Sequence, residues 1–386
     1  MGRPTQQVSV QKFELSKKMA NQSVKCLALL FVVTMAGALA PLGSAVASMN
    51  PTGPAWHARI VVKGQFADLM SAGSSLYAVS LATKGPASSG TRVVRVDPTS
   101  GKVVATSVVL PGITAPQFVD GALWIAGQRS HGTASSQSAF VVSKLSASTL
   151  RRVRVIQTPL GPFGEPILAG GPGGLLWVGV EGGTSSCDLR RVNPATGGSN
   201  TLAVVRVSAN PCAGMTLDTT GRYLYAATSA GGSDEIFKLN ARTGAMIGHG
   251  FFTAPAILFS MVAVESRLWV AGGYPGTDGS LTYLSTSPLK VLAHSNVGEQ
   301  SAGTLPTFGQ FPVVDYSDGR VWVGSDANLA CFAPTSPRVL AQVGQGPPPP
   351  IVTDSLVVVG GHLWANADFG PPTGLVRLAP PPTCLP

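Results

Sequence analysis

The segment Asp120-Gly-Ala-Leu-Trp-Ile-Ala-Gly127 contains the pattern from which the fold of this chain can be worked out. A turn-forming Asp-Gly pair precedes an aliphatic residue, a large aromatic residue and several small apolar residues. The aliphatic–aromatic pair occurs seven times, at Leu76-Tyr77, Leu123-Trp124, Leu176-Trp177, Leu224-Tyr225, Leu268-Trp269, Val321-Trp322 and Leu363-Trp364. The aromatic residues lie 42 to 53 residues apart. Self-similarity at such a period is typical of a repeat protein.

A second motif follows the aromatic residue by about 18 residues and reads Val94-Arg-Val-Asp-Pro-Thr-Ser-Gly-Lys-Val-Val104 in its first copy. Related copies are Leu189-Arg-Arg-Val-Asn-Pro-Ala-Thr-Gly197 and Ile236-Phe-Lys-Leu-Asn-Ala-Arg-Thr-Gly244. Alternating strand residues around an Asx and a Gly predict an antiparallel hairpin. We expect the Lys and Arg residues of these strands to face solvent.

Each repeat therefore contains four short strands, and four-stranded units repeated radially are typical of a β-propeller. We predict an all-β fold, a propeller of seven blades. The last repeat ends in Pro380-Pro-Pro after its third strand, whereas His57-Ala-Arg-Ile-Val-Val62 precedes the first repeat as an isolated strand. We expect this N-terminal strand to complete the last blade and close the ring, and the repeated aromatic residues to pack between neighbouring blades.

Composition agrees with this fold class. The 386 residues include 46 Gly and 31 Pro, which disfavour a mainly helical protein. Because 44% of the residues are hydrophobic and only 12% are charged, the chain can bury a core and intrinsic disorder is excluded.

The N-terminus carries a predicted signal peptide, residues 1–47, with an alternative start at Met19. Basic residues precede the apolar run Cys26–Ala40, and the small-residue site Ala45-Val-Ala47 follows it. We expect cleavage after Ala47, a single propeller domain over residues 48–386, and a secreted or extracytoplasmic location. The alternative is an uncleaved membrane anchor, which is the only membrane contact we expect.

Charge excludes one class of partner. The whole chain has a net charge of +9, but residues 1–47 contain five basic residues and one acidic residue, so 22 basic and 17 acidic residues remain. The longest basic cluster of this part, Arg151-Arg-Val-Arg154, alternates like a solvated strand. We therefore expect no nucleic acid partner. Ring closure leads us to expect a monomer.

Four cysteines follow the signal segment, and none of them lies in a C-x-x-C pair. An even number in an exported chain favours disulfides over a metal site. Three pairings are possible, and the phase of the repeats selects Cys187–Cys212 and Cys331–Cys384, the second fixing the C-terminal tail.

The Gly-x-Leu-Trp-Val strand and the Asp-Pro-Thr-Ser-Gly-Lys hairpin resemble those of secreted bacterial propellers of the virginiamycin B lyase, NHL and YVTN-repeat type. The resemblance covers Ala55–Pro386 and implies the same fold. Streptogramin lyases carry metal-binding His and Glu after the Leu-Trp strand, whereas Ile-Ala-Gly follows Trp124 and Val-Ala-Gly follows Trp269 here. The catalytic residues of that family are therefore not matched.

Ionisable residues that belong to the loops between the second and third strands, or between blades, are the candidate ligand-binding residues. Those loops share one end of a propeller. The candidates are Arg129, His131, Glu165, Asp188, Asp234, Glu235, Asp278, Asp326 and Asp368. They form no motif of a catalytic triad, and no EF-hand pattern is present in the sequence.

We therefore expect a non-enzymatic propeller without a cofactor or metal, which binds a small-molecule ligand or a partner protein through this end of the ring. The alternative is a lyase or hydrolase that uses a divalent cation in the central channel with His131 and Glu165. Metal content distinguishes the two.

Overall fold

The structure is a computed structural model, and it describes residues 59–81, 90–111, 116–130, 138–161, 166–181, 186–193, 204–208, 210, 212–230, 233–252, 257–273, 279–295, 305, 308, 312–325, 328–344, 355–367 and 373–385. These residues belong to one compact unit, Pro51–Pro386. The predicted signal segment 1–47, with Met19 and the cleavage site after Ala47, lies outside the described residues. Within the described ranges, no helix is long and apolar enough to cross a membrane.

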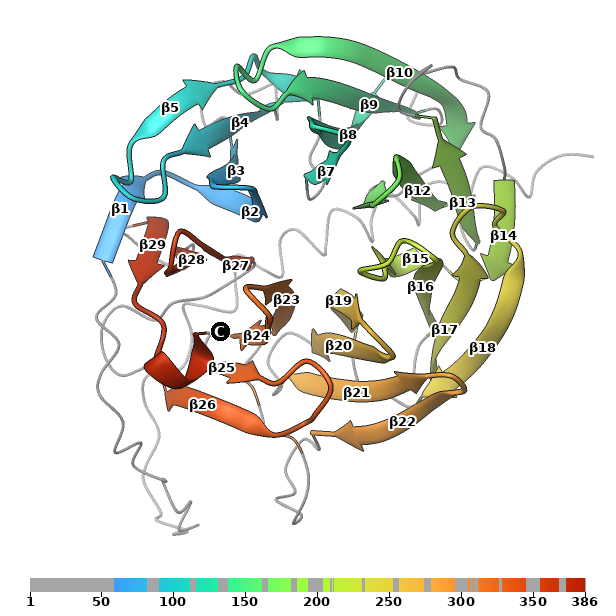
Figure 1. The fold of residues 1–386 in the computed structure, drawn as a ribbon. Helices are drawn as coiled ribbons and strands as arrows, with labels where there is room; N and C mark the ends of the chain where they lie inside the picture. The colour runs from blue at the N-terminus through green and yellow to red at the C-terminus, as the bar shows by residue number, and fades with distance from the viewer. Residues whose placement is uncertain are drawn as a thin grey trace, which may run out of the picture. The chain divides into compact units, whose positions relative to one another are not determined.

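Seven antiparallel sheets form a ring, and each has its first strand toward the centre (Figure 1). Blade 1 contains β2 (Phe66–Ala72), β3 (Ser75–Leu81), β4 (Gly90–Val96) and β5 (Val103–Thr106), and the short β6 (Leu110–Pro111) also pairs with β4. Blade 2 contains β7 (Gln117–Val119), β8 (Ala122–Ser130), β9 (Ser138–Ser146) and β10 (Arg152–Gly161). Blade 3 contains β11 (Ile167–Gly171), β12 (Leu175–Glu181), β13 (Cys187–Val192) and β14 (Val204–Ser208).

The remaining blades repeat this order. Blade 4 contains β15 (Cys212–Leu217), β16 (Tyr223–Ala230), β17 (Ser233–Asn240) and β18 (Met246–Phe252). Blade 5 contains β19 (Ile257–Val264), β20 (Arg267–Gly273), β21 (Ser280–Thr286) and β22 (Leu289–His294). Blade 6 contains β23 (Val313–Ser317), β24 (Arg320–Gly324), β25 (Asn328–Phe332) and β26 (Val339–Gly344). Blade 7 contains β27 (Leu356–Val359), β28 (His362–Ala367), β29 (Gly374–Leu378) and, on its outer edge, β1 (Arg59–Lys63).

The predicted seven-bladed propeller and its closure are confirmed. β1 pairs antiparallel with β29, with Arg59 opposite Arg377 and Lys63 opposite Gly374. At the same junction, the backbone N–H of Leu69 in β2 donates to Ser355 Oγ at 2.9 Å, and Asn366 Nδ2 donates to the carbonyl of Phe66 at 2.9 Å. Strand pairing thus completes blade 7, and blade 7 is joined to blade 1 by the chain that runs from β1 to β2 and by side-chain hydrogen bonds.

The predicted turns precede the Leu-Trp strands. Asp120 and Gly121 have φ angles of 49° and 73°, and Asp318 and Gly319 have 48° and 71°. Positive φ at both central residues is the type I′ geometry that matches the twist of a two-residue hairpin. Asp and Gly tolerate this backbone region, so the sequence pattern follows from the geometry.

The second motif forms the hairpin between the third and fourth strands. In blade 1, Asp97 Oδ1 accepts hydrogen bonds from the backbone N–H groups of Thr99 and Ser100, at 2.9 and 2.8 Å. These donors, the Ser100 amide foremost, lower the pKa of Asp97. Gly101 follows with a φ of 70°. The Asx residue therefore builds the turn, and the glycine supplies its left-handed residue.

The repeated aromatic residues are packing residues, as expected. All five tryptophans of the Leu-Trp positions are fully buried. Several polar atoms at these positions bond to the hairpin of the next blade. Trp177 Nε1 donates to the Ala241 carbonyl at 2.9 Å, Trp269 Nε1 donates to the Pro334 carbonyl at 2.9 Å, and Tyr77 Oη donates to the Ala147 carbonyl at 3.1 Å. The aromatic residues thus connect neighbouring blades as well as filling the space between them.

The prediction that the Lys and Arg residues of the third strands face solvent is wrong for Lys238, which is buried. In most blades the Lys or Arg lies directly opposite the buried aromatic residue, as Arg95 does opposite Tyr77 and Lys238 opposite Tyr225. Lys238 is 7% exposed, and its Nζ donates to the Thr286 carbonyl of blade 5 at 2.7 Å. Burial lowers its pKa. The cation faces the next blade because its long aliphatic stem covers apolar surface while Nζ reaches a carbonyl.

Both predicted disulfides are confirmed. Cys187–Cys212 has a Cα–Cα distance of 4.7 Å and connects β13 of blade 3 to β15 of blade 4. Cys331–Cys384 has a Cα–Cα distance of 6.1 Å and connects β25 to the C-terminal 3-10 helix η2 (Pro382–Cys384). The first disulfide therefore joins two neighbouring blades, and the second holds the C-terminal tail on blade 6.

Candidate functional site

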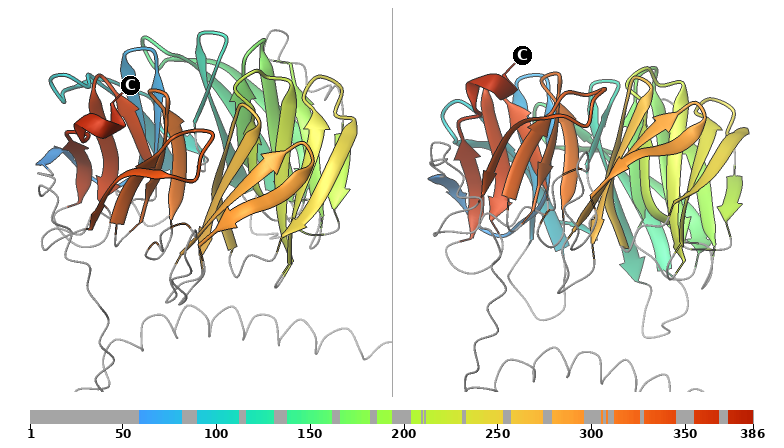
Figure 2. Two further views of the ribbon diagram at one scale, coloured as in Figure 1. Left: turned by 60° about the horizontal axis from the view of Figure 1, so that its bottom comes forward. Right: turned by 90° about the horizontal axis from the view of Figure 1, so that it is seen from below.

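The two ends of the ring differ in the connections they carry. We call the end formed by second-to-third-strand and inter-blade connections the loop face, and the opposite end the turn face. Figure 2 shows the tight turns of the turn face at the upper end, together with η2. Arg129, Asp188, Asp234 and Glu235 belong to strand ends that lead into the loop face.

The structure describes the candidates unequally. The side chains of Asp188 and Glu235 are described, whereas Arg129 in β8 and Asp234 in β17 are placed only as strand positions. The other five lie outside the described residues, namely His131, Glu165, Asp278, Asp326 and Asp368. Their predicted role in ligand binding stays a prediction.

Asp188 forms an ion pair across two strands of blade 3. Arg206 Nε donates to Asp188 Oδ1 at 2.9 Å, and Arg206 Nη2 donates to Oδ2 at 3.4 Å. The aspartate side chain is 11% exposed and that of Arg206 is 69% exposed. The hydrogen bond to Asp188 raises the pKa of Arg206 above its ordinary value. A carboxylate held by a fork of two donors is oriented and neutralised.

Glu235 belongs to the same interface. Its Oε2 accepts a hydrogen bond from Ser208 Oγ at 3.2 Å, and Ser208 lies opposite Cys187 in the β13–β14 pair. Asp188 and Glu235 thus both bond to β14, beside the Cys187–Cys212 disulfide. The structure brings these two candidates to the loop-face end of the interface between blades 3 and 4.

Metal ligation is not evident in the part of the chain that the structure describes. Within those residues, no group of three or more His, Cys, Asp or Glu side chains could hold a metal ion.

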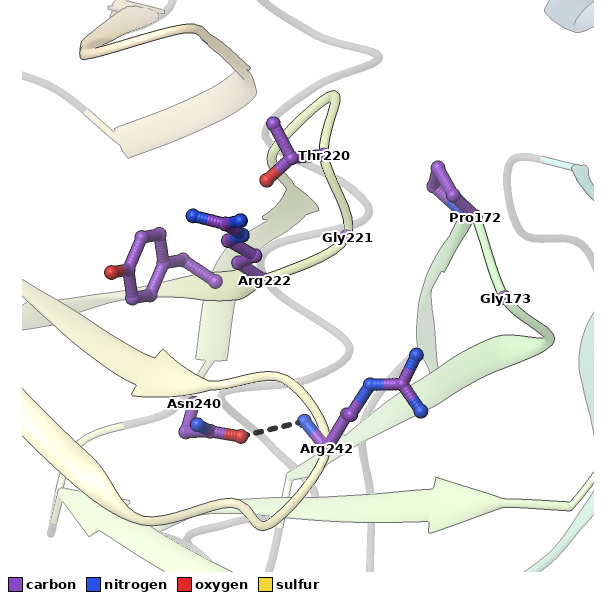
Figure 3. Close-up of a pocket in the computed structure, with 8 residues that line it drawn as sticks. Pro172, Gly173, Thr220, Gly221, Arg222, Asn240 and Arg242 are labelled. Atoms are coloured by element: carbon purple, nitrogen blue, oxygen red, sulfur yellow. Dashed lines mark hydrogen bonds between the residues drawn. The ribbon is translucent and has the colours of Figure 1, made fainter.

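A pocket of about 370 Å³ lies at the opposite end of the same interface, on the turn face. Three turns form it: the β11–β12 turn of blade 3, and the β15–β16 turn and β17–β18 hairpin of blade 4. The lining residues, most of which Figure 3 labels, are Pro172, Gly173, Thr220, Gly221, Arg222, Tyr223, Asn240 and Arg242.

Local hydrogen bonds fix the two turns of blade 4. Asp218 Oδ1 accepts from the backbone N–H groups of Arg222 and Tyr223, at 2.8 and 3.0 Å, and Thr220 Oγ1 donates to Asp218 Oδ2 at 2.6 Å. The Ala241 N–H donates to the Arg222 carbonyl at 2.9 Å, so the hairpin is tied to the turn. The position of each arginine backbone is therefore fixed by bonds within blade 4.

Blades 3 and 4 approach closely at this pocket. A Cβ on Gly221, whose φ is 68°, would lie 3.0 Å from the Pro172 carbonyl oxygen. A Cβ on Gly173 would lie 3.4 Å from Arg242 Nη2, and Figure 3 shows the Arg242 side chain extending toward that turn. Glycine at both positions leaves room for the contact and for the arginine.

Sequence reasoning missed this pocket because its residues come from three segments of two blades. The available signal was the basic residue inside each turn motif, Arg222 after Thr220-Gly221 and Arg242 within Asn-Ala-Arg-Thr-Gly. Because both arginines lie in segments that predict turns, they are not among the candidate binding residues predicted from the sequence.

No protein-family model matches this sequence, and neither does any curated protein. Solved structures are similar in fold. Kuenenia stuttgartiensis hydrazine synthase matches with a TM-score of 0.57 and 13% identity, covering 82% of this chain and 96% of that chain. The WD40 domain of Toxoplasma gondii coronin gives 0.54 and 10%, covering 86% and 88%. A chain of the mitotic checkpoint complex gives 0.53 and 11%, covering 91% and 98%. These likenesses confirm the propeller fold, and they extend to the fold alone.

Proposed function

We propose that the chain is a secreted, non-enzymatic propeller that binds a ligand or partner protein through its loop face. The observation that carries this proposal is the arrangement of Asp188 and Glu235. Each bonds to a polar side chain of β14, at 2.9 and 3.2 Å, and in this polar cluster Asp188 is buried while its partner Arg206 is exposed. Paired and partly exposed polar groups fix the register of a partner.

The frame around this cluster supports a binding role. The Cys187–Cys212 disulfide crosses the same interface, and disulfides persist in extracytoplasmic compartments. A rigid surface binds with a smaller loss of conformational entropy than a surface that must be ordered. Secretion is proposed on these disulfides and on the predicted signal segment.

Hydrogen–deuterium exchange tests which face of the propeller binds the partner. We would compare the protein alone with the protein mixed with an extract of the producing cell's envelope. We expect protection in peptides from the β12–β13 and β16–β17 ends, and an Asp188→Asn, Glu235→Gln variant should lose it. Protection confined to turn-face peptides, or no protection, would contradict the proposal.

The alternative function is a lyase or hydrolase with a divalent cation in the channel. Its motivation is the resemblance to virginiamycin B lyase-type propellers. Elemental analysis of protein purified without chelators separates the two functions. A stoichiometric divalent cation that is retained through gel filtration would favour the enzyme, and a metal-free protein that still shows loop-face protection would favour the binder.

A further inference from the structure

The lining of the turn-face pocket is positively charged and lacks a counter-charge. Arg222 and Arg242 are its only charged lining residues, and both side chains are exposed. Within the described part of the chain, neither guanidinium forms an ion pair or a hydrogen bond. Their donors are therefore available to a ligand.

Asp218 bonds to residues of the pocket but is not among the residues that line it. Asp218 is 3% exposed, and its two oxygens are engaged by the Thr220 hydroxyl and by the amides of Arg222 and Tyr223. A further cation lies next to a lining residue, because Lys238 Nζ is 4.0 Å from the centre of the Tyr223 ring. The local field therefore favours a negative ligand.

Neutral hydrogen-bond donors complete the lining. Asn240 Oδ1 is occupied by the backbone N–H groups of Arg242 and Thr243, at 2.9 and 3.0 Å, which directs its Nδ2 away from the turn as a donor. Tyr223 also belongs to the lining. Two guanidinium forks and an amide donor in one pocket match the oxygens of a small oxyanion.

The pocket is built before a ligand arrives. Trp177 of blade 3 bonds to the Ala241 carbonyl beside Arg242, the Ala241 N–H bonds to the Arg222 carbonyl, and Gly221 packs on the Pro172 carbonyl. The backbone that carries each arginine is therefore positioned by contacts with both blades. Only side-chain torsions remain to be ordered on binding.

We propose that this pocket binds a small divalent oxyanion, of which phosphate is the simplest representative, through Arg222 and Arg242. A volume of about 370 Å³ is at the lower end of the usual range for small-molecule sites, so the group is carried by a small molecule. This site is separate from the loop face, and its failure would leave the proposed function standing.

Isothermal titration calorimetry with inorganic phosphate and with sulfate, at constant ionic strength set by NaCl, tests the site. The variant Arg222→Gln, Arg242→Gln removes both charges and keeps the length of the side chains. Arg151→Gln, Arg152→Gln is the matched control, since it removes two exposed charges near the blade 2 hairpin. Circular dichroism and thermal unfolding establish that both variants are folded.

We expect saturable binding of at least one anion to the wild type, unchanged binding to the control, and a loss of about 100-fold or more in the pocket variant, about tenfold for each guanidinium. Equal losses in both variants would show diffuse charge attraction and overturn the site. Heats no larger than those of NaCl alone for both anions would overturn it as well.

Discussion

At the scale of single residues, the aromatic position of each blade has two physical roles that substitution can separate. Trp177 and Trp322 are both fully buried, but only Trp177 Nε1 has a bonding partner among the described residues, the Ala241 carbonyl. Burial of the ring is common to both, so the hydrogen bond is the difference between them.

The substitutions Trp177→Phe and Trp322→Phe therefore form a matched pair. Both remove the same atoms, but only the first leaves a buried carbonyl without its donor. We expect Trp177→Phe to lower the free energy of unfolding by about 1 kcal/mol more than Trp322→Phe does. Urea titration followed by fluorescence measures both. Equal losses would mean that ring packing alone carries the effect.

Asp315 gives stability a dependence on pH. Burial raises the pKa of this β23 carboxyl from 3.8 to about 6, against the lowering effect of the hydrogen bond that Ser317 Oγ donates at 2.7 Å. Since the folded state binds this proton more tightly than the unfolded chain, the free energy of unfolding falls as pH rises between about 4 and 6, and the loss is complete above that window.

We expect Asp315→Asn to remove this slope and to raise the free energy of unfolding at pH 8 by up to about 3 kcal/mol. Urea titrations at pH 4, 6 and 8 measure it. Asp318→Asn, an exposed turn residue that also tolerates a positive φ, is the control and should leave the slope in place. A slope that persists in Asp315→Asn would assign it to another group.

At the scale of strands and turns, serine side chains form hydrogen bonds between the innermost strands of neighbouring blades. Ser355 Oγ of blade 7 accepts from the Leu69 N–H of blade 1 at 2.9 Å, and Ser260 Oγ of blade 5 accepts from the Val314 N–H of blade 6 at 2.6 Å. The bonds are chemically alike, but the chain crosses the two junctions differently. β1 continues into β2 and is held to blade 7 only by its pairing with β29, whereas β22, which precedes β23, is joined to β21 of blade 5 by a hairpin.

Ser355→Ala and Ser260→Ala should each cost about 1–2 kcal/mol, because each leaves a partly buried N–H without an acceptor. We expect only Ser355→Ala to accelerate hydrogen exchange strongly in β2 and β27, since β1, the strand that continues into β2, is held to blade 7 by pairing alone. The same acceleration in β19 and β23 of Ser260→Ala would show that the hairpin joining β22 to its own blade has no effect.

The sequence predicted the strands and turns that belong to the repeated pattern. It did not predict the contacts that one repeat makes with another. The Asp-Gly turns, the hairpins, the closing strand and both disulfide pairs follow from positions along the chain. Leu150 does not: it adopts a φ of 55° at the turn position that Gly101 fills in blade 1. It is 1% exposed and packs into the core, so burial outweighs the backbone strain of a leucine there.

Less of the candidate site than of the fold was predictable from the sequence. Chain position identified which residues lead to the loop face, and two of them, Asp188 and Glu235, do lie near each other. Their partners Arg206 and Ser208 lie on β14, and pairing with that strand is set by the fold in space. The arginine pocket needed the contact between two turns of different blades, which no local pattern contains.

At the scale of the whole ring, the two disulfides restrict different parts of the unfolded chain. Cys187–Cys212 closes 25 residues and Cys331–Cys384 closes 53. On loop-entropy grounds they stabilise by about 3.5 and about 4 kcal/mol respectively.

We expect Cys331→Ala, Cys384→Ala to lower the thermal midpoint at least as much as Cys187→Ala, Cys212→Ala does. Each shift should be about 5 °C, measured by calorimetry. A reducing agent should lower the wild type by more than either pair alone. A wild type that is insensitive to reduction would contradict a structural role for both bonds.

The position of β1 on the outer edge of blade 7 sets an order of events during synthesis. β1 is made first, but its partner β29 is made more than 300 residues later. Until β29 is synthesised, the apolar strand β1 has no pairing partner and both of its edges are unpaired. The segment β27–β29 cannot complete blade 7 without β1. A circular permutant that begins at β27 and links Leu385 to Arg59 would make the two strands neighbours in time, and it should reach the native state sooner with fewer aggregates on the way.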